Sequence, residues 1–585
     1  MKDPVALGGM GAGPSDAGWP ASRLEIAIAA ARSGRATEAW AILDNLRLHT
    51  TDALRPGLEL LEGLLHQQAG DWPGAERVLR LALQHRPGWP AAERVLGCCL
   101  LNQGRPDEAI VLLRHGLADR AADPEASIAL AVALFRTGRV DESVEAFRGC
   151  IADGCNRARV EEILSSLMVT TMIAGRHEAE AVMAIHRKLG ALFGRPGHSN
   201  QALPNSPEPL RRLKIAYLCP NLRQHVLSMT IEPLLRHHDR DQFQVSVFAH
   251  VPRPDDKTRE LQLLADRWLF VHDLSDDQIA ARVRSDGIDI LIHPMGHWRD
   301  NRIGVMARKP APVQVAYQNN TPTSGLSAID YIVADRWINA NGFMNDHCTE
   351  AVVELPGGYS VFHYDVERLV AAATPSDDLG FITFGSFNNP MKLNDRTLQT
   401  WAQILRRAPR ARLLLKGKPF DSPEGIAAFR SRYVTVGGDG ERLDLAGWCS
   451  REEHFAYHDR LDIALDPFPF VGGMTTLDAL YMGVPVVTLV GRPPYSRVSY
   501  SFLHRIGAPE LCAGTVEEYV RIAVELAGSQ DRLHRYRIEL RQRFRQSSLV
   551  DQAGHVREFE QALRAMWQRW CATPRRAAGE ERRPQ

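Results

Sequence analysis

The first third of the chain repeats a glycine followed by Arg or Asp at nearly equal intervals. The glycines are Gly34, Gly70, Gly104, Gly138 and Gly175, and the spacings between them are 36, 34, 34 and 37 residues. Five positions after the first four glycines stands a small residue: Ala39, Ala75, Ala109 and Ser143. The fifth copy has Glu180 there, with Ala179 beside it. A period of this length, with small residues at fixed positions, predicts pairs of closely packed helices.

This pattern is typical of tetratricopeptide repeats. Each helix pair buries its apolar face only against the next pair, so residues 21–193 are predicted to form an all-α solenoid with a concave surface. Such solenoids bind many kinds of peptide, so the repeats do not identify a ligand. Residues 1–20 are predicted to be a disordered leader. Residues 194–210, rich in Pro, Gly, Ser and Asn, are predicted to be a linker.

After the linker, apolar strands alternate with helices. Strands are predicted at 213–218, 243–248, 288–292, 313–317, 331–333, 381–387, 412–415, 461–465 and 484–489. Helices are predicted at 276–285, 302–307, 394–406, 516–528 and 530–570. This alternation predicts parallel sheets covered by helices on both faces. Because the pattern restarts after a polar stretch at 369–379, we expect two Rossmann-like lobes, 211–368 and 378–572, with a ligand cleft between them and a disordered tail at 573–585.

Composition limits the range of functions. Lys plus Arg and Asp plus Glu each number 70, so the formal charge is zero, which argues against a nucleic-acid-binding surface spread over the whole protein. No apolar run approaches the length of a membrane span, so no membrane partner is expected. The nine cysteines include no Cys-x-x-Cys pair, and a reducing cytoplasm suits them better than a disulfide framework.

One loop of the second lobe has the features of a phosphate-binding turn. It follows the predicted strand at 461–465 and contains, in order, Gly472, Gly473, Met474, Thr475 and Thr476. Glycines let the backbone approach a ligand, and the helix predicted from Asp478 would attract an anion with its free N–H groups. Asp478 could accept hydrogen bonds from a ribose. The alternative is a tight turn capped by Thr475, and the loop alone favours neither.

Two other loops of this lobe carry candidate donor-binding residues. Lys392 follows the strand at 381–387, before a helix that Asn394 would cap, and could reach a diphosphate with Asn389 beside it. A solvated lysine is the alternative. Arg451 and His454 open a helix whose predicted capping box pairs Ser450 with Glu453. They could lie over a nucleoside, although His454 could also simply pack.

Histidines follow two strands of the first lobe. His225 comes after the strand at 213–218 and could assist proton transfer, although a structural histidine is at least as plausible. His293 and His297 follow the strand at 288–292 and could face the same cleft. Pro294 and Gly296 interrupt any helical metal-binding spacing, so no metal is expected.

Several ordered blocks resemble a known family. They span 213–228, 286–302, 308–314 and 323–331 in the first lobe, and 385–392, 451–454, 472–478 and 482–489 in the second. With the preceding repeats, they make the chain similar over about residues 22–570 to the O-linked N-acetylglucosamine transferase and SPINDLY-like family. Members of that family join tetratricopeptide repeats to a two-lobed GT-B glycosyltransferase.

The resemblance implies an inverting, metal-independent transfer from a UDP-sugar to Ser or Thr of a protein, with no cofactor. By matching positions, Lys392 would contact the diphosphate with Asn389 close by. The donor phosphates would also meet the loop residues Gly473, Met474, Thr475 and Thr476. Asp478 and Arg451 would contact the ribose, and His454 would lie against the uracil. The acceptor or sugar pocket would include His293, His297, Thr323 and Gly325.

The first lobe departs from the family pattern more than the second. Met229 stands where many members have a second histidine, and His293 stands where relatives often have Asp or Asn. In the segment 317–323 two glycines and a proline of the family block have moved or are missing, and Gly473 stands where some relatives have histidine. The donor half therefore matches better than the acceptor half.

These observations lead to a protein O-glycosyltransferase as the first hypothesis. The repeats would bind the protein acceptor, and either His225 or a donor phosphate oxygen would take the acceptor proton. N-acetylglucosamine is the expected sugar, while fucose from a GDP donor and a flagellin-type sugar stay open, as does a homo-oligomer. The alternative is a non-catalytic repeat scaffold with a degenerate nucleotide-sugar-binding body. A lipid acceptor is less favoured, because no basic amphipathic helix is evident.

Overall fold

The computed structural model describes residues 18–48, 51–118, 123–194, 203–317, 322–364, 368 and 373–573. It consists of two compact units, Met1–Val160 and Glu161–Gln585. Most of the predicted leader and tail, and the middle of the predicted linker, lie outside the described residues. So does most of the altered segment 317–323. None of the described helices combines the length and apolar content needed to cross a bilayer.

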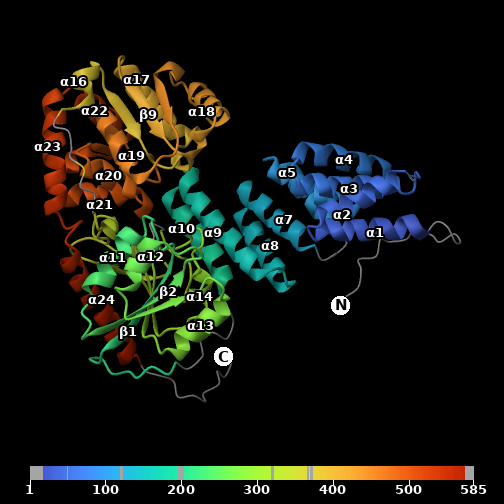
Figure 1. The fold of residues 1–585 in the computed structure, drawn as a ribbon, viewed down its shortest axis with the longest axis horizontal. Coiled ribbons are helices and arrows are strands. Elements are labelled where there is room, and N and C mark those ends of the chain that lie inside the picture. The colour runs from blue at the N-terminus through green and yellow to red at the C-terminus, as the bar shows by residue number, and fades with distance from the viewer. Residues whose placement is uncertain are drawn as a thin grey trace. The chain divides into compact units, whose positions relative to one another are not determined.

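The described part of the first unit consists of consecutive helix pairs, coloured blue to teal in Figure 1. The pairs are α1 (Gly18–Arg32) with α2 (Ala36–Arg47), α3 (Arg55–Gln68) with α4 (Trp72–His85), α5 (Pro90–Asn102) with α6 (Pro106–Gly116), and α7 (Pro124–Arg136) with α8 (Val140–Ala152). α9 (Arg157–Ala174) begins at the end of this unit.

The repeated residues explain the period. Gly34, Gly70, Gly104 and Gly138 lie between the two helices of each pair with φ between +74° and +82°, a conformation that glycine adopts without strain. The small residues that follow are fully buried where the paired helices meet. At the one polar position, the Ser143 hydroxyl donates to the Ala131 carbonyl of the partner helix at 2.7 Å. The prediction of an all-α repeat region is confirmed.

The first lobe of the second unit is built on a seven-stranded parallel sheet. Its strands are β1 (Leu213–Pro220), β2 (Phe243–His250), β3 (Arg267–Phe270), β4 (Ile290–His293), β5 (Val313–Ala316), β6 (Tyr331–Ala334) and β7 (Ala351–Glu354), in the order β3-β2-β1-β4-β5-β6-β7. The accompanying helices are α10 (Ala179–Gly190), α11 (Ser228–His237), α12 (Asp256–Gln262), α13 (Asp276–Ser285), α14 (Ile303–Ala307) and α15 (Phe343–His347).

The second lobe repeats this architecture with six parallel strands. They are β8 (Thr383–Ser386), β9 (Arg412–Lys416), β10 (Leu443–Ala446), β11 (Ile463–Leu465), β12 (Val486–Leu489) and β13 (Cys512–Ala513), in the order β10-β9-β8-β11-β12-β13. The helices are α16 (Pro375–Leu379), α17 (Asp395–Arg407), α18 (Pro423–Thr435), α19 (Arg451–Tyr457), α20 (Met474–Tyr481), α21 (Val498–Arg505), α22 (Val516–Ala527) and α23 (Gln530–Gln546).

The last helix returns to the first lobe. The predicted helical stretch at 530–570 is broken after Gln546, and α24 (Gln552–Ala572) packs against α11 and β5, beside the green strands of Figure 1. The Tyr317 hydroxyl lies 2.7 Å from Nε2 of His555, and the Trp567 indole donates to the Glu208 carbonyl at 3.0 Å.

Each sheet has one point where the strand order reverses. β1 pairs with both β2 and β4, and β8 pairs with both β9 and β11. At such a point the loops leaving neighbouring strands turn in opposite directions, so a crevice opens at their carboxyl ends. The predicted fold of two Rossmann-like parallel lobes after a helical repeat region is confirmed.

Candidate functional site

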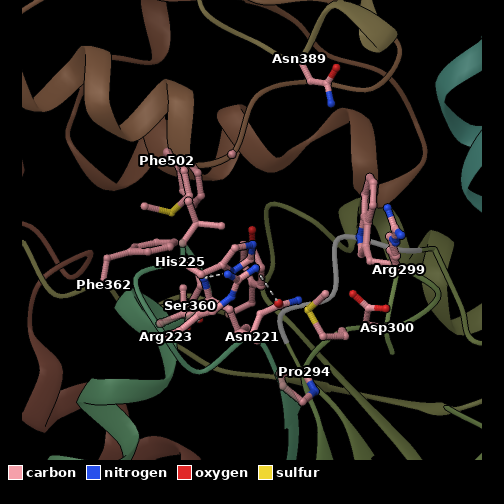
Figure 2. Close-up of a pocket in the computed structure, with 18 residues that line it drawn as sticks. Asn221, Arg223, His225, Pro294, Arg299, Asp300, Ser360, Phe362, Asn389 and Phe502 are labelled. Carbon is pink, nitrogen blue, oxygen red and sulfur yellow. Dashed lines mark hydrogen bonds between the residues drawn. The ribbon is translucent and has the colours of Figure 1, made fainter. Parts of the chain in front are cut away.

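A cavity of about 800 Å³ lies between the two lobes, at the crevices that these reversals open. The loop after β1 contributes Asn221, Arg223 and His225, and the loop after β4 contributes residues between Pro294 and Asp300. The second lobe contributes Asn389 from the loop after β8, and Gly473 and Met474 from the loop after β11. Figure 2 shows Asn389 on the opposite side of the cavity from Arg223 and His225.

Lys392 lies beside the first turn of α20. Its Nζ donates to the Val471 carbonyl at 2.8 Å and lies 3.4 Å from Oδ1 of Asn388. The Thr475 hydroxyl donates to the same Asn388 oxygen at 2.9 Å. One amide therefore holds the lysine ammonium and the helix terminus together. Burial lowers the pKa of Lys392 to about 8, against the opposing effect of the Asp466 carboxylate.

Asp466 forms a hydrogen bond with the backbone of the glycine loop. Its buried carboxylate accepts the Gly472 N–H at 2.6 Å and the Thr488 hydroxyl at 2.8 Å. Burial raises the pKa of Asp466, and these hydrogen bonds oppose the shift. α20 begins at Met474, earlier than predicted, and Gly473 occupies its N-cap position without a side-chain cap. Because the Thr475 side chain bonds to Asn388 and not to the helix end, the alternative of a turn capped by Thr475 is wrong.

The residues predicted to contact ribose and base also lie together. Asp478 is 8% exposed, and its Oδ2 lies 3.2 Å from Nε2 of His454. Its other oxygen accepts the Tyr364 hydroxyl at 2.8 Å. Arg451 comes 3.3 Å from the sulfur of Met229, which belongs to the first lobe. Because a ribose presents hydroxyl donors, the Asp478 carboxylate is suited to bind it.

The hydrogen bond of His225 fixes its tautomer. Its Nδ1 accepts the Leu227 N–H at 3.2 Å, so the neutral ring carries its proton on Nε2. Burial lowers the pKa of His225, and the Arg223 guanidinium adds to this shift, so the ring is neutral at pH 7. In this state the nitrogen left for a ligand is a hydrogen-bond donor.

The residues predicted for an acceptor or sugar pocket are buried outside the cavity lining. Nε2 of His297 lies 2.8 Å from the Ser324 carbonyl, and its Nδ1 lies 3.1 Å from the hydroxyl of Ser165 on α9. The Thr323 hydroxyl donates to Glu350 at 2.5 Å. A Cβ on Gly325 would clash with the backbone of α10. These residues join the sheet to α9 and α10, and their predicted binding role stays a prediction.

His293 is the fourth of these residues. It is fully buried at the end of β4, where its Nε2 donates to the Asn301 carbonyl and its Nδ1 has no partner among the described residues. Burial lowers the pKa of His293 to about 4 and that of His297 to about 3, so both rings are neutral. Within the described residues, no three His, Cys, Asp or Glu side chains form a metal-sized cluster.

Sequence reasoning missed several residues of the site. Asn388 precedes a predicted residue, and Asp466 directly follows a predicted strand, so position could have indicated both. Tyr364, which bonds Asp478, and the cavity residues Phe362 and Phe502 stand in no recognisable pattern. Only the folded chain brings them to the cleft.

Comparisons with known proteins agree with this architecture. The model of glycosyl transferase family 41 matches residues 170–364 and 373–559, which include both lobes. A tetratricopeptide-repeat model matches residues 66–126 and 100–164.

Individual relatives match over the same region. A probable UDP-N-acetylglucosamine–peptide N-acetylglucosaminyltransferase SPINDLY of Petunia hybrida is 33% identical over 395 residues, 66% of this chain and 42% of the relative. The UDP-N-acetylglucosamine–peptide N-acetylglucosaminyltransferase of Caenorhabditis elegans is 26% identical over 480 residues, 62% of this chain and 41% of the relative. The chain therefore spans about two fifths of the length of these curated relatives.

A solved structure matches nearly the whole chain. A mutant of the Thermobaculum terrenum O-GlcNAc transferase superposes with a TM-score of 0.68 at 32% identity, covering 89% of this chain and 99% of that one. One relative thus matches most of the chain in a single superposition.

Proposed function

Because the chain belongs to glycosyl transferase family 41, we propose that it transfers N-acetylglucosamine from UDP-N-acetylglucosamine to Ser or Thr hydroxyls of a protein. The names of the SPINDLY and Caenorhabditis elegans relatives support this donor and a peptide acceptor. The helical repeats would bind the acceptor protein. Family membership also favours this function over a non-catalytic scaffold.

The observation that carries the proposal is the shared bond to Asn388. Lys392 and Thr475 both reach its Oδ1, so an ammonium and the N-terminus of α20 lie side by side at the reversal of the second sheet. Departure of UDP leaves negative charge on a diphosphate. Donors held in advance around that position stabilise the transition state, and here they come from a lysine and a helix end. The proposed reaction therefore needs no divalent ion.

With the diphosphate placed at Lys392 and Thr475, the other residues proposed to bind the UDP-sugar can be assigned. Asn389, Gly473 and Met474 line the cavity where the diphosphate and the sugar would meet. Asp478 would accept the ribose hydroxyls, while Arg451 and His454 would lie over the ribose and the uracil. An acceptor would enter from the first lobe, through the loops that follow β1 and β4.

In the proposed step the acceptor oxygen attacks the anomeric carbon from the face opposite UDP. A new carbon–oxygen bond forms while the bond to the β-phosphate oxygen breaks, so the anomeric configuration inverts. The acceptor hydroxyl loses a proton in this step. Since Nδ1 of His225 already accepts the Leu227 N–H, its Nε2–H is placed to donate. This favours a donor phosphate oxygen as the proton acceptor and His225 as a residue that positions the substrates.

We retain a cytoplasmic location as part of the proposal. All nine cysteines are free thiols, which suits a reducing compartment.

Removing the Lys392 ammonium tests the function. With UDP-N-acetylglucosamine and a protein substrate, Lys392→Ala should transfer sugar at least about tenfold more slowly than the wild type, because the leaving diphosphate loses a preplaced cation. Lys418→Ala removes an exposed lysine of the same lobe and should leave the rate unchanged. Equal rates for the wild type and Lys392→Ala would reject this role for Lys392, and a wild type that neither binds UDP nor transfers sugar would reject the function.

A further inference from the structure

A second lysine of the second lobe is buried among aromatic rings. Lys416 is the last residue of β9 and is 6% exposed. Its Nζ lies 5.6 Å from the ring centroid of Phe387, 5.8 Å from that of Trp448 and 5.9 Å from that of Tyr457. Its hydrogen bond goes to the sulfur of Cys449 at 3.4 Å. Within the described part of the chain, no carboxylate pairs with it.

This environment leaves the ammonium poorly satisfied. A lysine carries three N–H donors, and a thiol sulfur is a weak acceptor. Aromatic faces attract a cation, but at these distances they replace only part of the lost hydration. Because an unsatisfied buried donor costs free energy, a ligand oxygen that accepted from Nζ would be bound favourably.

The position of Lys416 indicates which part of a ligand it would meet. β10, β9, β8 and β11 are neighbours in the sheet, so their carboxyl ends form one continuous edge. Lys392 and Thr475 lie at the β8–β11 end of this edge, and the Phe387 ring is near both Lys416 Nζ and His454, whose ring centroid is 5.9 Å from its own. His454 in turn bonds Asp478. Phosphate, ribose and base positions thus follow one another along the edge toward Lys416.

Trp448 provides an open surface at this end. Trp448 is 69% exposed, which is unusual for an indole, and its ring lies beside the Lys416 ammonium. A planar heterocycle stacked on such a ring gains binding energy whatever its hydrogen-bonding groups. The Trp448 ring would stack on a base, and the Lys416 ammonium would contact the hydrogen-bonding edge of that base.

We propose that Lys416 determines the nucleobase specificity of the donor site. Its ammonium donates a hydrogen bond to an exocyclic carbonyl oxygen of the base, O4 of uracil or O6 of guanine. Cytosine and adenine carry an amino group at that position. Since the amino group and the Lys416 ammonium are both hydrogen-bond donors, they could not bond to each other. This inference rests on the proposed function, because it assumes that a nucleoside diphosphate occupies the edge of the second sheet.

Binding of UDP and CDP to the full chain, measured by titration calorimetry, gives the decisive comparison, because the two differ only at position 4 and the adjoining N3. We expect the wild type to bind UDP about tenfold or more tightly than CDP, as for a hydrogen bond to a charged group. Lys416→Met keeps an unbranched side chain one atom shorter than lysine and removes the charge, and it should bind UDP and CDP with equal affinity. Lys418→Met, the exposed control two residues away, should retain the wild-type preference. GDP and ADP extend the comparison to purines.

A change in the ligand tests the same contact without relying on the variant's fold. 4-Thio-UDP replaces O4 by sulfur, a weaker acceptor, and should bind the wild type more weakly than UDP. It should bind Lys416→Met as well as UDP does, so that the two changes are not additive. Equal binding of UDP, CDP and 4-thio-UDP by the wild type would overturn the role of Lys416 and leave the transferase intact. A wild type that binds no nucleotide would overturn both.

Discussion

At the residue scale, the proposed contact of Lys392 with the donor diphosphate predicts how donor binding depends on pH. The pKa of the unliganded lysine is lowered to about 8 because its ammonium is buried, with Asp466 as the main opposing charge. A diphosphate bound as proposed would add negative charge beside Nζ and raise this pKa. Donor binding and protonation of Lys392 would then be linked.

This linkage predicts the pH dependence of donor affinity. Well below pH 8 the free protein already carries the charge, so the Kd for UDP should change by only about twofold from pH 7 to 8. Above pH 8 the lysine must take up a proton on binding, so affinity should fall, approaching about tenfold per pH unit. Calorimetric titrations from pH 7 to 10 measure this profile. Lys392→Arg, which stays charged throughout, should show no such fall, and a flat wild-type profile would contradict the linkage.

The tautomer of His225 gives a second prediction at this scale. His225→Gln keeps an N–H near the Nε2 position but cannot act as a base. If His225 positions the substrates through this N–H, transfer by the variant should stay within about tenfold of the wild type, whereas loss of a general base costs about 10² to 10⁴. Initial rates at saturating donor and acceptor measure the difference. His225→Ala, which lacks both functions, is the matched comparison, and equal inactivity of the two variants would restore His225 as the base.

At the element scale, the predicted helix caps, which depend only on residues close together in the sequence, are confirmed. Asn394 caps α17, and Ser450 forms a capping box with Glu453 at α19, because these bonds form within one helical turn. The start of α20 was predicted too late. The sequence left open whether Thr475 caps the turn, whereas its hydroxyl bonds Asn388 on another loop, a contact that no local pattern contains.

The glycine loop before α20 provides an element-scale prediction. A Cβ at Gly472 would lie 2.8 Å from Oδ1 of Asp466 and would clash with the Thr476 hydroxyl. Gly472→Ala should therefore displace the loop and weaken UDP binding by about tenfold or more, since overpacking a tight site costs roughly 1–3 kcal/mol. Gly528→Ala, where a Cβ meets only ordinary contacts at 3.7 Å, is the control. Unchanged UDP affinity in Gly472→Ala would show that the loop is not part of the donor site.

At the scale of the whole molecule, the order of lobes and the central strands could be predicted, but the sheet edges could not. The four strands absent from the sequence prediction, β3, β7, β10 and β13, are the outermost strands of the two sheets. An edge strand is covered less completely, so it lacks a buried apolar run; β3 and β7 contain no fully buried residue. The contacts of Asp478 with Tyr364 and of Asp466 with the glycine loop depend on the assembled fold.

The return of α24 to the first lobe has a consequence for how the protein is made. The fully buried Tyr317 ring packs against Phe559, with the centroids 4.8 Å apart, and Trp567 is likewise fully buried. While the ribosome is still translating the donor lobe, the sheet of the first lobe has already emerged without this cover. Nascent chains are therefore expected to expose this apolar face until α24 has left the ribosome, an interval in which a chaperone could protect it.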